Sequence, residues 1–155
     1  PEYQSFAIQH EGRQPGEWID LYGIPQVLWP IHCVQETEGA QFISNLDQSR
    51  VKRVFRKGQN PRIDSYSGFF DNDHQSSTGM GEYLREQGVD EVFMVGLATD
   101  YCVRFTAADA AEPGFRTIVI SDATRGVNLQ KGDSDRALVA LQEQGVRILL
   151  SSELP

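Results

Sequence analysis

The second half of the chain alternates between short continuous apolar runs and stretches with apolar residues at helical spacing. The run 92–97 is too brief for a helix, rich in β-forming residues and polar on both sides, which is typical of a strand buried in a parallel sheet. The same reasoning predicts further strands at 117–121 and 146–150, and helices at 81–87, 101–111 and 133–144.

The first third of the chain is less regular. Residues 1–50 hold little periodicity and several glycines and prolines, so we expect loops with at most short helical turns, and a short helix over 38–46. Residues 51–56 alternate and predict a strand, which Lys57 follows directly. The order β, α, β, α, β, α, β predicts one three-layer, Rossmann-like α/β domain over 1–155, with a parallel sheet and helices on both faces.

Cys102 stands where the strand 92–97 gives way to a helix. Gly96, Ala98 and Thr99 are small enough for a tight turn, which places the sulfur near the first N–H groups of that helix. The partial positive charge of a helix N-terminus stabilises a thiolate. A buried structural cysteine is the commoner role, but open α/β sheets bind ligands at the carboxyl ends of their strands. We therefore favour a nucleophile.

Other residues near the same rim have two interpretations each. Lys57 is either a solvated surface lysine or a charge that stabilises a thiolate. His32 is either a hydrogen-bonded loop histidine or a metal ligand, and its spacing to His10 and His74 suggests no closed metal site. Each of these signals is weak alone.

Aromatic residues allow a similar choice. Trp29, Tyr66 and Phe69 are either ordinary core residues or the walls of a flat slot for an aromatic ring. Asp100, two residues before Cys102, is expected to cap the helix.

Composition narrows the class of partner. The net charge of −8 and the pI of about 4.8 argue against nucleic acid or an anionic membrane. No apolar run reaches the roughly 18 residues of a transmembrane helix, and no signal peptide opens the chain. Two cysteines in a chain of 155 residues favour a reduced, cytoplasmic setting over a disulfide scaffold.

Four ordered motifs together point to a known family. These are WPIHCV, FRKGQNPRIDSYSGFFDN, GLATDYCV after a strand, and SDATRGVN after the next strand. In this order they resemble the bacterial nicotinamidases (pyrazinamidases) of the isochorismatase-like cysteine hydrolase superfamily, over essentially the whole chain.

The resemblance implies an activity and a role for each matching residue. Cys102 would attack the amide carbonyl of nicotinamide, giving a thioester and then nicotinic acid and ammonia in NAD salvage. The backbone N–H groups of Ala98 and Cys102 would form the oxyanion hole, with a cis bond before Ala98, and Lys57 would act beside the thiol.

The same resemblance implies a metal and a ring pocket. His32 would ligate a divalent ion, namely zinc, iron or manganese. Trp29 and Tyr66 would line the pocket for a small aromatic amide. The resemblance is also compatible with a homo-oligomer.

The sequence departs from the family pattern in one respect. The base aspartate of a D-x-Q-N-D-F motif and two further metal ligands of a D-W-H motif are absent from it. Residues 1–7 resemble the segment that follows D-W-H, so we expect a family member without its N-terminal strands.

Three alternatives remain open from the sequence. The first is a truncated and inactive domain that only binds or assembles. The second is a sister cysteine hydrolase of the same superfamily that acts on another small amide. A redox protein ranks last, because there is no C-x-x-C motif.

Overall fold

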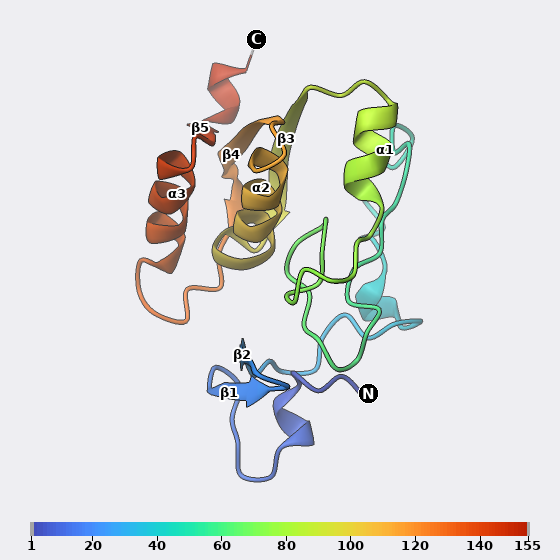
Figure 1. Cartoon of the computed structure of the whole chain (residues 1–155), viewed down its shortest axis with the longest axis vertical. Helices are drawn as coiled ribbons and strands as arrows, with labels where there is room; N and C mark the ends of the chain where they lie inside the picture. Colours follow the sequence, from blue (N-terminus) through green and yellow to red (C-terminus); the bar gives the residue numbers. More distant parts are fainter. Residues whose placement is uncertain (1, 155) are drawn as a thin grey trace. The chain divides into compact units, whose positions relative to one another are not determined.

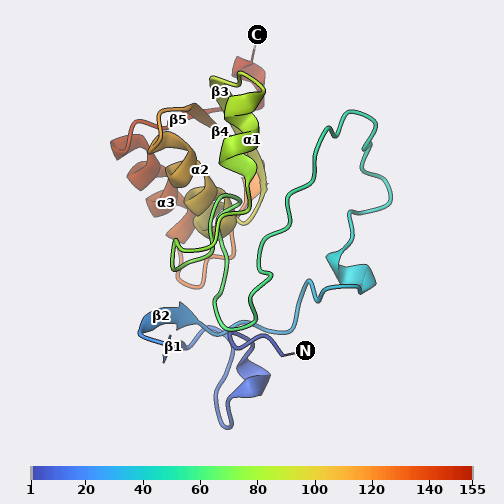
Figure 2. The same cartoon turned by 45° about the vertical axis from the view of Figure 1, so that its right-hand side comes forward.

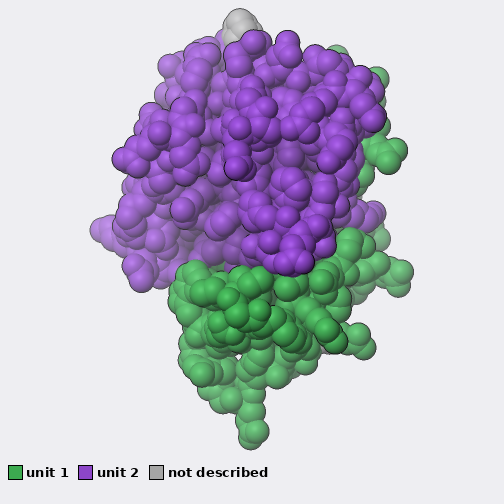
Figure 3. All heavy atoms as spheres, viewed as in Figure 1, with its two compact units in different colours: residues 1–54, 58–64 green, residues 55–57, 65–155 purple. Residues whose placement is uncertain are grey.

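The structure is a computed structural model that describes residues 2–154 (Figure 1). The chain divides into two compact units, residues 1–54 with 58–64 and residues 55–57 with 65–155 (Figure 3). We call them unit 1 and unit 2 and describe each by itself.

Unit 2 is built on a parallel sheet of three strands, β3 (Glu91–Leu97), β4 (Arg116–Arg125) and β5 (Arg147–Leu149), in the order β3-β4-β5. Met94 lies opposite Val119, and Val119 lies opposite Ile148. Because the connections are parallel, the carboxyl ends of all three strands meet at one edge of the sheet.

Two helices cover one face of this sheet. α2 (Arg104–Ala111) connects β3 to β4, and α3 (Asp133–Glu143) connects β4 to β5. Both connections step across the sheet in the same direction, so right-handed crossovers place both helices on the same side. Figures 1 and 2 show α2 and α3 side by side against the strands. A buried cluster joins them to the sheet: Val103, Ala107, Val119, Leu141 and Val146.

The remaining helix of unit 2, α1 (Met80–Glu86), packs by a second apolar cluster. Phe69, Ala110 and Phe115 are buried in it, and Met80 and Leu84 of α1 pack against them. The opposite side of β3 is open: Phe93, Val95 and Leu97 are 48%, 60% and 72% exposed.

Unit 1 contains an antiparallel hairpin, β1 (Trp18–Leu21) and β2 (Ile24–Val27), joined by Tyr22 and Gly23. Both linking residues have positive φ, 57° and 83°, which is the backbone of a tight two-residue hairpin turn. Short 3-10 turns occupy Ala7–Gln9 and Glu38–Ala40 in unit 1 and Ser151–Glu153 in unit 2.

The α/β class and the later elements of the sequence analysis are confirmed. The strands predicted at 92–97, 117–121 and 146–150 are β3, β4 and β5, and the helices predicted at 81–87 and 133–144 are α1 and α3. The predicted helix 101–111 begins as a π-helical turn, Thr99–Val103, before α2. β4 continues beyond the predicted strand 117–121 as far as Arg125.

Three predictions for the first half are wrong. A hairpin forms in unit 1 where loops were expected. Pro25 argues against a strand in the sequence, but β2 pairs only with the neighbouring β1, so the proline is tolerated there. The expected helix over 38–46 is one 3-10 turn with no buried residue, so no packing supports its extension. Residues 51–56 form no strand, because no described segment pairs with them and alternation alone supplies no hydrogen-bond partner.

Candidate active site

The centre of the site is a turn at the carboxyl end of β3. Residues 98–103, here called the cysteine turn, connect β3 to α2 through the π-helical stretch that contains Cys102. The Ala98 carbonyl accepts hydrogen bonds from the N–H groups of Tyr101, at 3.1 Å, and Val103, at 3.0 Å. The Leu97–Ala98 peptide bond is cis, as the resemblance implies. The Cys102 thiol is free and half-buried, so it is neither bridged nor sealed in the core.

The cysteine turn is tied to the end of β4 by two buried hydroxyls. Thr99 Oγ1 donates to Thr124 Oγ1 at 2.9 Å, and Thr124 Oγ1 donates to the Ser121 carbonyl at 3.1 Å. Thr99 and Thr124 are 3% and 4% exposed, so no water competes for these bonds. The turn therefore has a fixed attachment to the central strand.

Asp100 makes a second attachment to the segment that follows β4. Its Oδ1 accepts from the Val127 N–H at 2.9 Å, and its Oδ2 accepts from the Asn128 N–H at 2.7 Å. The expectation that Asp100 caps the helix is wrong, since neither the π-helical turn nor α2 has a side-chain cap. The carboxylate reaches across to residues 126–128 because strand ends from β3 and β4 meet at this edge.

Aromatic rings lie next to Cys102 in unit 2. The Tyr66 ring packs edge-on against Tyr101, with centroids 5.3 Å apart, and at a tilt against Phe105, with centroids 5.2 Å apart. Tyr66 is 8% exposed. Burial, followed by the negative charges of Asp100 and Asp133, raises the pKa of the Tyr101 phenol. The folded chain therefore favours the neutral form of the Tyr101 phenol.

Lys57 belongs to the same unit. Its half-buried side chain donates a hydrogen bond through Nζ to the carbonyl of Ser65, the residue before Tyr66. The structure thus links Lys57 to the segment that packs against Tyr101, beside Cys102. Four of the candidate residues, Cys102, Ala98, Lys57 and Tyr66, lie in unit 2.

The other two candidates, Trp29 and His32, lie together in unit 1. Their rings meet edge-on at 6.3 Å between centroids, and the ring of Phe6 lies 5.7 Å from that of His32. The indole N–H of Trp29 donates to Asp64 Oδ2 at 2.9 Å. Asp64 is only 8% exposed, so this bond fixes the plane of the indole.

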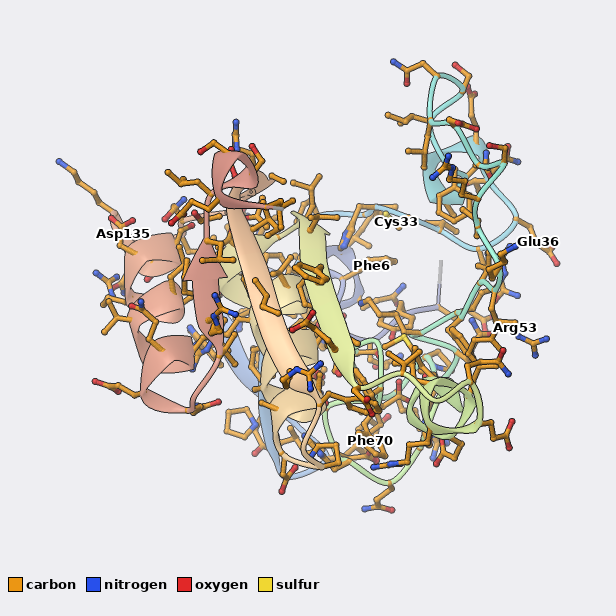
Figure 4. All side chains as sticks on the ribbon, turned by 90° about the horizontal axis from the view of Figure 1, so that it is seen from above. Phe6, Cys33, Glu36, Arg53, Phe70 and Asp135 are labelled. Carbon is orange, nitrogen blue, oxygen red and sulfur yellow. The ribbon has the colours of Figure 1, made fainter. Side chains whose placement is uncertain are left out.

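His32 is suited to be one metal ligand. Its Nδ1 lies 2.7 Å from the Pro30 carbonyl, which can only accept, so Nδ1 carries the proton and the Nε2 lone pair is available. Residues 2–154 contain no cluster of three or more histidine, cysteine, aspartate or glutamate side chains that could hold a metal. His32 is therefore oriented by its backbone contact, but it is not part of such a cluster within residues 2–154. Cys33, labelled in Figure 4, follows His32 and is exposed.

The sequence analysis missed three residues that position the site: Thr99, Thr124 and Asp64. The sequence marks Thr99 only as a small residue of the turn, and Thr124 lies just beyond the strand predicted at 117–121. Asp64 stood inside the RIDSYS stretch, where an acid between apolar and aromatic residues is a signal of a buried, hydrogen-bonded carboxylate.

A free cysteine on the turn after a parallel strand, where buried hydrogen bonds hold the turn, lies at the edge of the sheet at which open α/β proteins bind their ligands. The family model for the isochorismatase domain matches residues 19–153. The chain belongs to the isochorismatase family, and the resemblance stated from the motifs is confirmed.

Several of the relatives that match are nicotinamidases. The Escherichia coli nicotinamidase is 47% identical over 144 residues, which cover 93% of this chain and 67% of the relative. The solved nicotinamidase/pyrazinamidase of Acinetobacter baumanii has a TM-score of 0.94 at 44% identity, covering 99% of this chain and 74% of that one.

A third relative was solved with a metal. The pyrazinamidase of Pyrococcus horikoshii, in complex with zinc, has a TM-score of 0.66 at 37% identity, covering 79% of this chain and 63% of that one.

Among the described helices of our chain, none is long and apolar enough to cross a membrane.

Proposed function

We propose that this chain hydrolyses nicotinamide to nicotinic acid and ammonia through a thioester on Cys102, a step in NAD salvage. One observation carries the proposal. The half-buried free thiol of Cys102 sits on a turn at the carboxyl end of β3, in a chain 47% identical to the Escherichia coli nicotinamidase. Residues 1–155 would act as one functional domain with a small aromatic amide as ligand, in the cytoplasm.

The reaction is an acyl transfer in two steps. The Cys102 sulfur attacks the amide carbonyl carbon, the C–N bond breaks, and the amide nitrogen leaves as ammonia with the proton taken from the thiol. Water then attacks the thioester, the C–S bond breaks, and nicotinic acid and the free thiol result. The aspartate that serves as base in the family motif has no counterpart in this sequence, so we assign the proton transfer to no residue of this chain.

The cysteine turn stabilises the charge that develops. The N–H groups of Ala98 and Cys102 would bind the oxyanion of both tetrahedral intermediates, and such donors contribute roughly 3–4 kcal/mol to the rate. This works because the donors are fixed before the reaction starts. The bonds from Thr99 and Asp100 supply that fixation in the turn.

The remaining candidates bind and orient. Lys57 would stabilise the thiolate by its positive charge. The family resemblance gives both Tyr66 and Trp29 a role in binding the pyridine ring, and the indole plane of Trp29 is held by Asp64. His32 would contribute its Nε2 to a divalent ion (zinc, iron or manganese), which when bound would orient or polarise the pyridine nitrogen.

The test is ammonia release from nicotinamide by the purified full chain. Cys102→Ala should lower the rate at least about a thousandfold, because it removes the nucleophile, while the circular dichroism spectrum is unchanged. Cys33→Ala, the matched control on the other free cysteine, should keep the parent rate. A rate in Cys102→Ala within tenfold of the parent, or a parent with no ammonia release, would refute the proposal.

A further inference from the structure

Both oxygens of Asp100, the carboxylate nearest to Cys102 in sequence, accept hydrogen bonds from backbone N–H groups. Each oxygen of Asp100 accepts one N–H, from Val127 at 2.9 Å and from Asn128 at 2.7 Å, and the residue is 5% exposed. Hydrogen bonds from backbone N–H groups to an ionised carboxylate are about twice as strong as neutral ones. Asp100 therefore joins two loops that come from neighbouring strands.

The segment 126–128 is held closely against this carboxylate. A Cβ added at Gly126 would lie 3.1 Å from Asp100 Oδ1 and 1.8 Å from Ser134 Oγ, so any side chain there would force the Ser134 hydroxyl to move. Asn128 has a positive φ of 53°, and its Oδ1 accepts from the Ser134 N–H at 3.0 Å. The segment is thus fixed on one side by Asp100 and on the other by the start of α3.

This geometry bears on the proposed reaction through the position of Asp100 in the turn. It lies between Ala98 and Cys102, the two residues whose N–H groups would bind the oxyanion. Fixing Asp100 restricts the backbone on both sides of it. A side chain with both oxygens already engaged and buried is also poorly placed to take a proton from a thiol.

We propose that Asp100 is a positioning residue that clamps the cysteine turn to residues 126–128 and thereby aims Cys102. The inference rests on the proposed function for its catalytic consequence. The clamp itself is a property of the fold and is measured without turnover.

The experiment compares two variants of the full chain with a matched control. Asp100→Ala removes both oxygens that accept from the N–H groups of Val127 and Asn128. Asp100→Asn keeps one acceptor oxygen and replaces the other by an NH2 group, which cannot accept. Asp135→Asn, an exposed acid on α3 that Figure 4 shows pointing away from the fold, removes the same charge without touching the turn.

The first readout is hydrogen exchange at the amides of Val127 and Asn128. In Asp100→Ala both amides should exchange at least about tenfold faster, while amides of the core residues Val119 and Leu141 keep their protection. In Asp100→Asn one of the two amides should exchange at least about tenfold faster. In Asp135→Asn both amides should exchange at the parent rate. Exchange at both amides within twofold of the parent in Asp100→Ala would overturn the clamp.

The second readout is kinetic, per Cys102 thiol titrated. Asp100→Ala should lower kcat about tenfold or more with KM within about threefold, because a misaimed nucleophile affects the transition state more than binding. A structural role alone would lower the number of titratable sites and leave kcat per site unchanged. That result would overturn the positioning role even if the amides exchange faster.

A third readout separates this inference from the proposed function. If the parent releases no ammonia, the proposed function fails, and the inference is then decided by the rate at which iodoacetamide alkylates Cys102 at high pH. The rate in Asp100→Ala should be at least about threefold faster, because the loosened turn exposes the half-buried sulfur. A smaller change would overturn the inference.

Discussion

The hydroxyl pair of Thr99 and Thr124 offers a sharp test of how the cysteine turn is held. Thr99 Oγ1 donates to Thr124 Oγ1 at 2.9 Å, and Thr124 Oγ1 donates onward to the Ser121 carbonyl at 3.1 Å. Replacing either threonine by valine keeps the branched shape and removes only the hydroxyl. The two single variants and the double variant form a double-mutant cycle.

The expected loss of unfolding free energy in each variant depends on which buried polar groups lose their hydrogen-bond partners. Thr99→Val should cost about 1 kcal/mol of unfolding free energy, because Thr124 keeps its bond to Ser121 and loses only an incoming donor. Thr124→Val should cost about 2 kcal/mol, because it leaves the Thr99 hydroxyl buried without its acceptor and the Ser121 carbonyl without this donor. The double variant should cost little more than Thr124→Val, which gives a coupling energy of about 1 kcal/mol.

The assay is urea unfolding of the four chains, with hydrogen exchange at residues 98–103 as a local readout. Thr117→Val is the matched control: Thr117 is also on β4, is 4% exposed and donates to the Phe115 carbonyl at 3.1 Å. It should destabilise the fold by a similar amount without faster exchange in the cysteine turn. Additive single variants, with a coupling energy below about 0.3 kcal/mol, would refute the reasoning.

Two further predictions concern the surroundings of the thiol and the metal. The raised pKa of Tyr101 favours its neutral form in the folded chain, so its contribution to stability is present below about pH 10 and is lost as the pH rises through the folded pKa. In an ultraviolet titration the late-ionising absorbance should fall by one tyrosine in Tyr101→Phe, and an unchanged late phase in that variant would contradict the assignment. His32→Ala should lower the divalent metal bound per chain and the rate regained on adding zinc after chelation, whereas His74→Ala should keep both. Equal metal content in His32→Ala and the parent would remove His32 as a ligand.

The elements that the sequence predicted well are those whose neighbours are close in the chain. β3, α2, β4 and α3 follow one another with short connections, so the periodicity of each already reflects the burial it receives. The carboxyl ends of parallel strands must meet, which is why the position of Cys102 on a turn at a sheet edge followed from the pattern.

The residues that the sequence could not place depend on partners far along the chain. The local sequence around Asp100 predicts a helix cap. In the structure, however, its carboxylate oxygens accept from backbone N–H groups 27 and 28 positions later. Residues 51–56 alternate like a strand, but alternation does not state which strand would pair with them. Trp29 depends in the same way on Asp64, 35 positions away.

The central claim is that Cys102 carries the acyl group during turnover, and mass spectrometry of the acid-quenched chain during nicotinamide hydrolysis tests it most directly. The peptide that contains Cys102 should gain the mass of one nicotinoyl group, and the gain should disappear when the substrate is exhausted or when Cys102 is replaced by alanine. Ammonia release without this mass gain on the Cys102 peptide would contradict the account. So would a mass gain found only on the peptide that contains Cys33.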